Sequence, residues 1–220
     1  MDSLFTRLKT LVWLLLLMCC FLMSSCVTGR RVVSLSVPSA TKTAVPRGSI
    51  YIEAVTDARR FQSSPSDPSV PSINGDVSAL TPTTKNLMIG RQRNSFGMAM
   101  GDIALPNGSS VTETVKTLVE EAWQRRGYSS AKDAREAKTI TIRVDEFWSW
   151  FTPGMWSVLF EAKIACSVTI THPNGKIFTI QGHGENSGQV ASNANWQLAY
   201  ARAFDNFLQN SEVELQKAGL

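Results

Sequence analysis

The sequence predicts an α+β fold in which an antiparallel or mixed sheet carries a long hairpin and two helices pack on one of its faces. The strongest strand signal is an unbroken alternation of apolar residues from Trp156 to Ile170. Two segments, 111–126 and 192–216, instead repeat apolar residues at helical spacing. The order strand, long loop, helix, three strands, helix favours a layer of helices on one side of the sheet.

An export leader opens the chain. Two basic residues precede the apolar stretch 11–23, and two serines lead from it to Cys26. The stretch is shorter than the ~20 residues that a membrane-spanning helix needs. Because small residues before a cysteine suit a lipoprotein signal peptidase, we predict a signal peptide over 1–25 and a lipid on Cys26. Ordinary secretion and an uncleaved anchor are the weaker alternatives.

The composition without the leader is mildly basic. Twenty basic and 17 acidic residues remain, without the clustered basic face that is typical of nucleic-acid binding. Cys166 is then the last free thiol, so no intrachain disulfide can form. Its place on the apolar face of a strand predicts a small buried residue. We expect no nucleic-acid partner, no cofactor and no metal.

Residues 26–47 are predicted to be the lipidated cysteine and a flexible tether. They are rich in Ser, Thr, Val, Ala and Pro and show no sustained period. Arg30 and Arg31 would lie near anionic lipid head groups. Residues 48–220 then form a single α+β domain in the periplasm, long enough to bury a core of its own.

The first half of this domain has one clear strand and two irregular stretches. The strand is expected over 48–55, with Ile50 and Ala54 on the same face. Residues 61–82 form a long loop rich in Ser and Pro, and loops of this length are usually functional or disordered. The segment 86–107 shows neither helical nor strand periodicity.

Capping residues bound the first long helix. Ser110 and Glu113 form a capping box before it, and Gly127 is the expected left-handed stop. Alternating Ile and Val residues then predict a strand over 138–148. An aromatic-rich connection, 148–156, leads from it to the strongest strand.

The turn at 172–176 decides how the strongest strand pairs with the next one. A two-residue Asn-Gly turn would pair Pro173 with Lys176, and the ladder would lose a hydrogen bond because proline has no N–H. A type I turn followed by a glycine bulge avoids this loss. We therefore expect Cys166 opposite Gly182.

Arg91, Arg93, Asn94 and Asp102 form the best polar group in the sequence. One interpretation is a loop that is pinned by pairing between arginine and aspartate. The other is a surface that recognises an acidic or carbohydrate partner, since the planar guanidinium fits carboxylates. The residues alone leave both interpretations open.

Trp148, Trp150 and Phe151 form an aromatic group next to Trp156. These rings could pack in the core or at a sheet edge. Alternatively, those that project from the connection could form an exposed contact surface for a protein, a glycan or lipid head groups.

The two histidines give weak signals for catalysis. His172 lies in the turn and His183 on the hairpin, and no second group of ligands indicates zinc. A nucleophilic pair of Cys166 and His183 is disfavoured, because the preferred register places the two side chains on opposite faces. An envelope hydrolase that acts on peptidoglycan with His183 and Glu185 is the alternative that stays open.

Two stretches carry a family resemblance. They are Ile89-Gly-Arg-Gln-Arg-Asn-Ser-Phe-Gly-Met-Ala-Met-Gly-Asp-Ile-Ala-Leu-Pro106 and Phe147-Trp-Ser-Trp-Phe-Thr-Pro-Gly-Met-Trp156. These two stretches resemble a proteobacterial subgroup of which some members are labelled flagellar biosynthesis. The wider resemblance, over residues 48–215, is to the YajG-like bacterial lipoproteins. It is carried by Cys26, the first strand near Ile50-Tyr-Ile, the helix that ends in Arg126-Gly127-Tyr128, the long hairpin and the C-terminal helix. The resemblance implies a non-enzymatic envelope lipoprotein with an α+β fold and brings no ligand or catalytic residues. Val27, in place of Asp after the cysteine, implies the outer membrane, with the domain facing the periplasm.

The sequence as a whole thus predicts a lipid-anchored binding or assembly module that serves flagellar or envelope biogenesis. Its membrane contact is the lipid on Cys26, and its partner is expected to be an envelope protein. The expected contact surface is the segment 86–107 together with the connection 148–156. Besides the hydrolase, an oligomeric structural subunit is a further alternative.

Overall fold

The computed structural model describes residues 29–39, 45–73, 75–94, 98–172 and 175–220. The predicted signal peptide and the predicted lipidation site, Cys26, lie outside these residues. Within the described residues, no helix combines the length and the apolar character needed to cross a bilayer.

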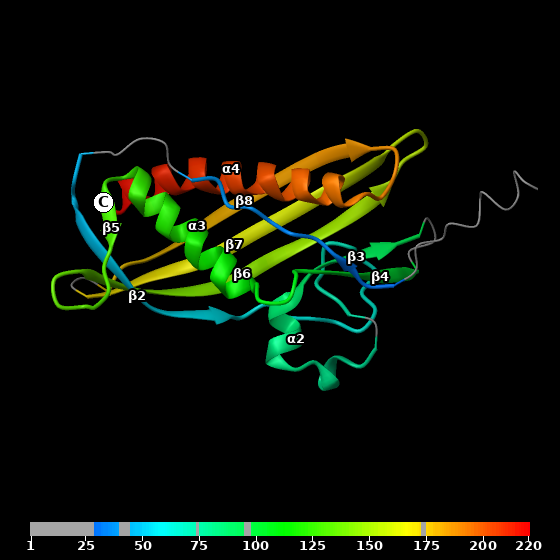
Figure 1. Ribbon diagram of the computed structural model, residues 1–220, viewed down its shortest axis with the longest axis horizontal. Coiled ribbons are helices and arrows are strands. Elements are labelled where there is room, and N and C mark those ends of the chain that lie inside the picture. Colours follow the sequence, from blue (N-terminus) through cyan, green and yellow to red (C-terminus); the bar gives the residue numbers. More distant parts are fainter. Residues whose placement is uncertain (1–28, 40–44, 74, 95–97, 173–174) are drawn as a thin grey trace, which may run out of the picture.

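The predicted α+β fold is confirmed. In the described part of the chain, eight strands form one mixed sheet. Helices α3 (Val111–Arg125) and α4 (Asn193–Lys217) lie on one of its faces, and the short helix α2 (Pro82–Leu87) lies on the other side (Figure 1). The strands are β1 (Arg31–Val32), β2 (Gly48–Asp57), β3 (Met88–Arg93), β4 (Ala99–Ala104), β5 (Tyr128–Ser130), β6 (Lys138–Pro153), β7 (Val158–His172) and β8 (Ile177–Gly188).

Strand β6 is the centre of the sheet. On one side it pairs with the antiparallel β7 along its whole length. On the other side it pairs first with the parallel β2, as far as Val144, and later with β3 at Ser149. Two separate strands therefore share one edge of β6, and the junction between them must be closed by another part of the chain.

Both long helices begin and end close to where the sequence predicts. Ser110 Oγ accepts a hydrogen bond from the Glu113 N–H at 3.1 Å, and Gly127 follows α3 with a φ of +88°. Ser192 caps α4 in the same way, by accepting from the Asn195 N–H at 3.3 Å. These signals are reliable because caps and stops depend only on neighbours in the sequence.

The β7–β8 hairpin has a register two residues away from the expected one. Cys166 faces Ile180 rather than Gly182. Because the difference is an even number of residues, every side chain keeps its expected face of the sheet. Cys166 is accordingly buried, and His183 lies on the opposite face.

A bulge inside β6 changes which residues face the helices. The register slips between Val144 and Glu146. Before the slip Val144 faces the main core, and after it Phe147 does, so that Trp148 points to the outer face. The expected strand 138–148 is also too short, because the supposed aromatic connection continues the strand as far as Pro153.

The first strand contains a similar irregularity. β2 has a register slip between Ile52 and Ala54. Ala54 is therefore exposed, contrary to the prediction that it shares the face of Ile50, and Val55 packs against the core in its place. One inserted residue is enough to exchange the two faces of a strand.

The segment 86–107 is an antiparallel pair of strands, β3 and β4, although it has no strand periodicity. Met88, Ile89, Gly90 and Arg91 are all buried. A strand that is covered on both faces has no polar side, so it lacks the alternation by which strands are recognised.

Residues 29–39 do not form the expected tether. β1 pairs with β4 in parallel, and the Val33 N–H donates to the Ala104 oxygen at 2.9 Å. Val33 is fully buried, and Leu35 and Val37 pack against the core. The prediction of a free tether is therefore wrong for this stretch, which is part of the folded domain.

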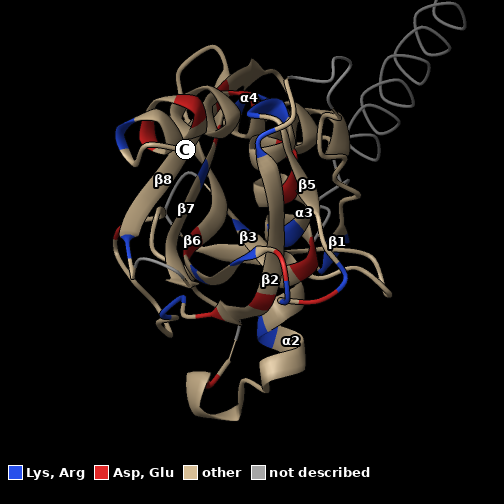
Figure 2. Ribbon diagram, turned by 90° about the vertical axis from the view of Figure 1, so that its left-hand side faces the viewer, with Lys and Arg blue, Asp and Glu red and all other residues tan. Residues whose placement is uncertain are grey.

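One end of the sheet, which we call the charged end, carries the loop 131–137 with its four charged residues. Figure 2 looks onto this end, where β5 and the C-terminus lie. Its loop 131–137 holds an exposed ion pair between Arg135 and Asp133, at 2.9 Å. Lys176 of the adjacent turn donates to the Ala218 oxygen at 2.7 Å and so holds the end of α4.

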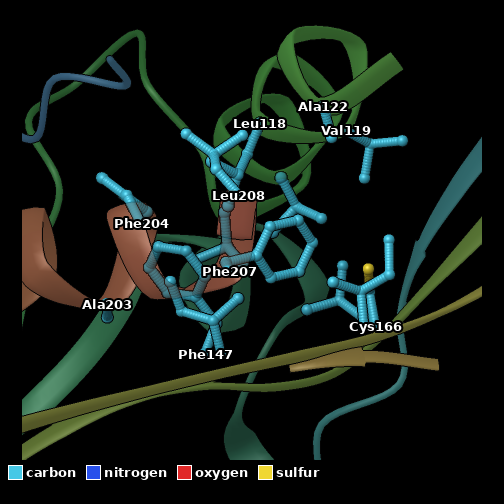
Figure 3. Close-up of a cluster of buried hydrophobic side chains, with 14 of the residues drawn as sticks. Leu118, Val119, Ala122, Phe147, Cys166, Ala203, Phe204, Phe207 and Leu208 are labelled. Atoms are coloured by element: carbon cyan, nitrogen blue, oxygen red, sulfur yellow. The ribbon is translucent and has the colours of Figure 1, made fainter. Parts of the chain in front are cut away.

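The main core lies between the sheet and the two long helices (Figure 3). Side chains that meet there are Leu118, Val119 and Ala122 of α3, Phe204, Phe207 and Leu208 of α4, Phe147 of β6 and Cys166 of β7. Helix α4 lies directly on β8 because the strand presents Gly182 and Gly184 to it. A Cβ at Gly184 would lie 2.2 Å from the Ala199 oxygen, so no larger residue fits there.

Candidate functional site

Two of the predicted site residues, Arg91 and Asp102, face each other in the β3–β4 ladder. The Arg91 Nε lies 3.8 Å from Asp102 Oδ1. The Nη1 of Arg91 donates to the carbonyl oxygen of Ile73 in the long loop. Only 5% of Arg91 is exposed. Arg91 therefore pins the loop to the hairpin, as the first of the two interpretations expects.

Arg93 and Asn94 lie at the end of β3. The Arg93 Nη2 donates to Ser72 Oγ at 3.3 Å, and the side chain stays partly exposed. The Asn94 N–H donates to the Met98 oxygen at 2.8 Å, while Asn94 Oδ1 accepts from the Met98 N–H at 2.9 Å. These two bonds close the end of the hairpin and so fix the position of Arg93.

A groove of about 540 Å³ lies between this hairpin and the long loop. It is lined by Ser63, Ser64, Pro65, Ser66, Arg91, Arg93, Met98 and Ala99. Guanidinium and hydroxyl groups supply its polar atoms, and no acidic side chain is among these lining residues. The second interpretation, recognition of an acidic or carbohydrate partner, thus also has a place in the structure.

The groove carries positive charge. Burial lowers the pKa of Arg91, the Asp102 carboxylate acts against this, and the neighbouring charge of Arg93 lowers the pKa further. Arginine stays protonated at neutral pH, because its ordinary pKa lies above 12. The two guanidinium groups therefore repel each other, and the Asp102 carboxylate that faces Arg91 offsets part of this repulsion.

The aromatic residues lie elsewhere than expected. Trp148, Trp150 and Phe151 are only 1%, 8% and 8% exposed, so the prediction of an exposed aromatic platform is wrong for these three rings. The bulge in β6 and the cover of the long loop place them inside. Trp156, at the β6–β7 turn, is 85% exposed, and the strand expected to begin there begins at Val158.

His183 lies between two glutamates on the outer face of the sheet. Its Nε2 is 3.6 Å from Glu161 Oε1, and its Nδ1 is 3.8 Å from Glu185 Oε1. The ring stacks on Trp150, with centroids 6.4 Å apart. Among the residues that the structure describes, these three form the one group of histidine and acidic side chains whose ligand atoms lie within 4.8 Å. They could hold a metal ion or exchange a proton, and the sequence did not indicate Glu161.

A family model described as "uncharacterized lipoprotein" matches residues 95–210, which is more than half of the chain. The protein belongs to this lipoprotein family. The resemblance to the YajG-like lipoproteins is thereby confirmed, and membership indicates a location in the cell envelope. None of the curated proteins matches the chain.

Two solved structures resemble the lipoprotein. The first is protein XCC0632 from Xanthomonas campestris, a DUF330 protein, with 11% identity, 87% of this chain and 99% of that chain covered, and a TM-score of 0.48. The second is an uncharacterized protein with 10% identity, 87% and 98% covered, and a TM-score of 0.38.

Arg59 of the lipoprotein closes the junction at the edge of β6, a role that sequence reasoning missed. Its Nη1 donates to the oxygens of Met88 at 2.6 Å and of Phe147 at 2.9 Å, and its Nη2 donates to the Lys85 oxygen at 2.7 Å. Asp57 holds the guanidinium through bonds of 2.9 and 2.7 Å. Arg59 thus satisfies carbonyl groups at the point where β2 leaves β6 and β3 joins it. The one available signal was an acid and an arginine just after a strand.

Cys166 of the lipoprotein is a buried free thiol, as predicted. Burial raises the pKa of this thiol, and the charge of Asp145 raises it further. The thiol therefore stays protonated at neutral pH and has the character of a small apolar residue.

Proposed function

We propose that this lipoprotein is anchored by a lipid on Cys26 to the periplasmic leaflet of the outer membrane, where it acts as a non-enzymatic binding or assembly module. The leader pattern and membership of the lipoprotein family support the anchor. Val27 supports sorting to the outer membrane. Flagellar or envelope biogenesis is the process in which we place the module.

The groove beside Arg91 and Arg93 is the observation that carries the binding role. Its walls offer the partly exposed guanidinium of Arg93 on one side, next to the buried Arg91, and the hydroxyls of Ser63, Ser64 and Ser66 on the other. A guanidinium presents a planar fork of donors that matches a carboxylate. Hydroxyl groups can donate to the same carboxylate. We therefore propose an acidic segment of an envelope protein as the partner.

Photo-crosslinking in cells tests this role. A photoreactive residue at the exposed position 64, in the wall of the groove, is expected to capture a protein. Arg93→Glu should abolish that adduct, because it places a negative charge where the acidic segment binds. Arg135→Glu is the matched control, because it reverses the charge of an exposed arginine at the charged end of the sheet. This variant should leave the adduct unchanged.

Two results would contradict the proposed contact. One is an adduct at position 64 that is equally strong in Arg93→Glu. The other is the absence of an adduct at position 64 while a probe at position 135 captures a partner. For the anchor, fatty-acid labelling that survives in Cys26→Ala would reject the assignment.

The group of Glu161, His183 and Glu185 favours a second candidate, an envelope hydrolase. Both ring nitrogens face a carboxylate, an arrangement that can move a proton. Purified lipoprotein incubated with peptidoglycan is expected to release no soluble fragments. If the wild type does release fragments, and Glu161→Gln and Glu185→Gln both lose this activity while keeping the stability of the wild type, the hydrolase would take the place of the proposed binding module.

A further inference from the structure

The folded domain begins very close to the predicted lipid. The Gly29 N–H donates to the Met100 oxygen at 3.1 Å, and from there the chain continues along β4. Cys26 is three residues before Gly29 in the sequence. Three residues span at most about 10 Å even when fully extended. The domain therefore cannot stand off the bilayer on a long tether if Cys26 carries a lipid.

Strand directions show which part of the domain must face the bilayer. β1 runs parallel to β4, β4 antiparallel to β3, and β3 parallel to β6. Gly29, at the start of β1, therefore lies at the same end of the sheet as the last residues of β6. Figure 1 shows this end on the right, opposite the charged end.

Two uncharged segments lie at this end, where the basic residues Arg30, Arg31 and Arg93 also lie. The β6–β7 connection and its flanks, residues 151–160, contain no charged residue, and neither does the stretch 186–192 after β8. The two lie side by side, because Val158 is paired with Gly188. We call 151–160 and 186–192 together the uncharged end. It contrasts with the charged end, where the loop 131–137 holds the exposed ion pair of Arg135 and Asp133.

Large apolar side chains project from the uncharged end. Met155 and Trp156 are 88% and 85% exposed, and Val190 is 66% exposed. The first two are the central residues of a tight turn, which Gly154 closes by donating its N–H to the Ser157 oxygen at 2.8 Å. This turn therefore presents both side chains to the surroundings of the protein. Exposed apolar side chains of this kind mark a surface that is covered by something else.

We infer that the uncharged end rests on the phospholipid bilayer, with Met155 and Trp156 inserted at the boundary between head groups and acyl chains. The inference rests on the proposed lipid anchor at Cys26, which brings this end to the surface. Trp is enriched at membrane interfaces because its large ring is apolar and its N–H can still reach water or head groups. The absence of charge in both segments removes the cost of placing ionised groups there. Arg30, exposed beside Gly29, can meet anionic head groups.

A depth measurement on the full lipoprotein tests this orientation. The mature protein is purified from membranes and reconstituted into vesicles of phosphatidylethanolamine and phosphatidylglycerol. Trp156→Cys is labelled with an environment-sensitive fluorophore, which is read with quenchers attached to the lipid chains. Cys166 is fully buried, so the native protein should not take up label there. Because Trp156 is 85% exposed, its replacement leaves the packing intact.

Ile177→Cys is the matched control. Ile177 is also an exposed apolar residue, at 69%, and begins β8 at the charged end. We expect a blue-shifted, several-fold brighter emission and quenching by lipid for the label at position 156. The label at position 177 should show neither change.

Each contrary outcome has a distinct meaning. If the protein floats with the vesicles but both labels stay in water, the orientation is wrong while the anchor stands. If the protein does not float, the anchor at Cys26 fails, and the orientation fails with it. If the label at position 156 becomes shielded in detergent as the protein concentration rises, a second copy covers this end in place of the bilayer, which also overturns the inference.

Discussion

Phe147 and Trp148 are neighbours in β6 and equally buried, at 0% and 1% exposure, but different parts of the molecule cover them. Phe147 lies under the long helices and stacks on Tyr200, with centroids 5.0 Å apart. Trp148 lies under the long loop, where Phe61 meets it edge-on at 5.6 Å and the Pro68 oxygen accepts its Nε1–H at 3.2 Å. Equal burial therefore does not mean equal rigidity. The inner face is enclosed by helices and strands, and the outer face by a loop that is held through side-chain contacts.

Phe147→Ala should give the largest loss of stability. The variant leaves a cavity between regular elements that cannot close, so we expect a loss of about 3–5 kcal/mol in the free energy of unfolding. Urea unfolding followed by tryptophan fluorescence measures it. Trp156→Ala, which removes an exposed ring, is the control and should change little. A loss from Phe147→Ala below that from Trp148→Ala would contradict the comparison of the two faces.

Arg59→Met should give the next largest loss, because Arg59 joins the two regions. The variant leaves the carbonyl groups of Met88 and Phe147 without their donor and removes the nearer ion-pair partner of Asp57, which keeps Lys85 at 3.6 Å. We expect a loss of about 2–4 kcal/mol. Arg60→Met is the matched control, since the adjacent Arg60 is exposed. Equal losses in the two variants would show that the junction at β6 does not depend on this guanidinium.

The inner region could be predicted from the sequence to a greater extent than the outer one. Helices α3 and α4 and their buried faces follow from caps and helical spacing, which are local signals. The bulge after Val144 has no local signal, and it decides that Trp148 faces the loop. Strand β3 is buried on both faces, which removes its alternation. A strand of this kind is recognised only from partners that are distant in the sequence.

The candidate site shows the same division. The group of Arg91, Arg93, Asn94 and Asp102 was visible as a run of polar residues on a short segment. The serine wall of the groove comes from the long loop, and its position depends on the contacts of Arg91 with Ile73 and of Arg93 with Ser72. Such contacts between distant segments have no signature in a single sequence.

Trp148→Ala should cost less than Phe147→Ala although it removes a larger side chain. The long loop can move into the space, and water can reach the Pro68 oxygen, so we expect about 2 kcal/mol, below the usual range for a buried tryptophan. Proteolysis of the native protein offers a second measurement. Cleavage within residues 61–82 should increase in this variant and stay unchanged in Phe147→Leu. Unchanged cleavage would contradict the assignment of the loop as the cover of Trp148.

Acid should weaken the junction that Arg59 closes at the edge of β6, because Asp57 holds the guanidinium there. Burial raises the pKa of this carboxyl, but the hydrogen bonds and charge of Arg59 and the charge of Lys85 outweigh it, and the pKa lies below its ordinary value. In the unfolded chain an aspartate has a pKa of about 3.9. Because the pKa in the folded protein is lower, the ionised carboxyl stabilises the fold at pH values above about 3.9. This stabilisation is lost as the pH falls from there through the pKa of the folded protein. Urea midpoints from pH 7 to pH 3 should fall more steeply in the wild type than in Asp57→Asn. Parallel curves would exclude Asp57 as the group responsible.

His183→Ala should have the smallest effect, because the outer face of β8 is not covered by the long loop. The ring is half exposed, and its contacts with Glu161 and Glu185 exceed 3.5 Å. Exposed ion pairs of this kind contribute about 0–1 kcal/mol, and the stacking on Trp150 adds little because one side of the ring faces water. We expect a change within about 0.5 kcal/mol in urea unfolding. A loss in the free energy of unfolding as large as that of Trp148→Ala would mean that Glu161, His183 and Glu185 hold the sheet together. The outer face would then have a second rigid region that does not depend on the long loop.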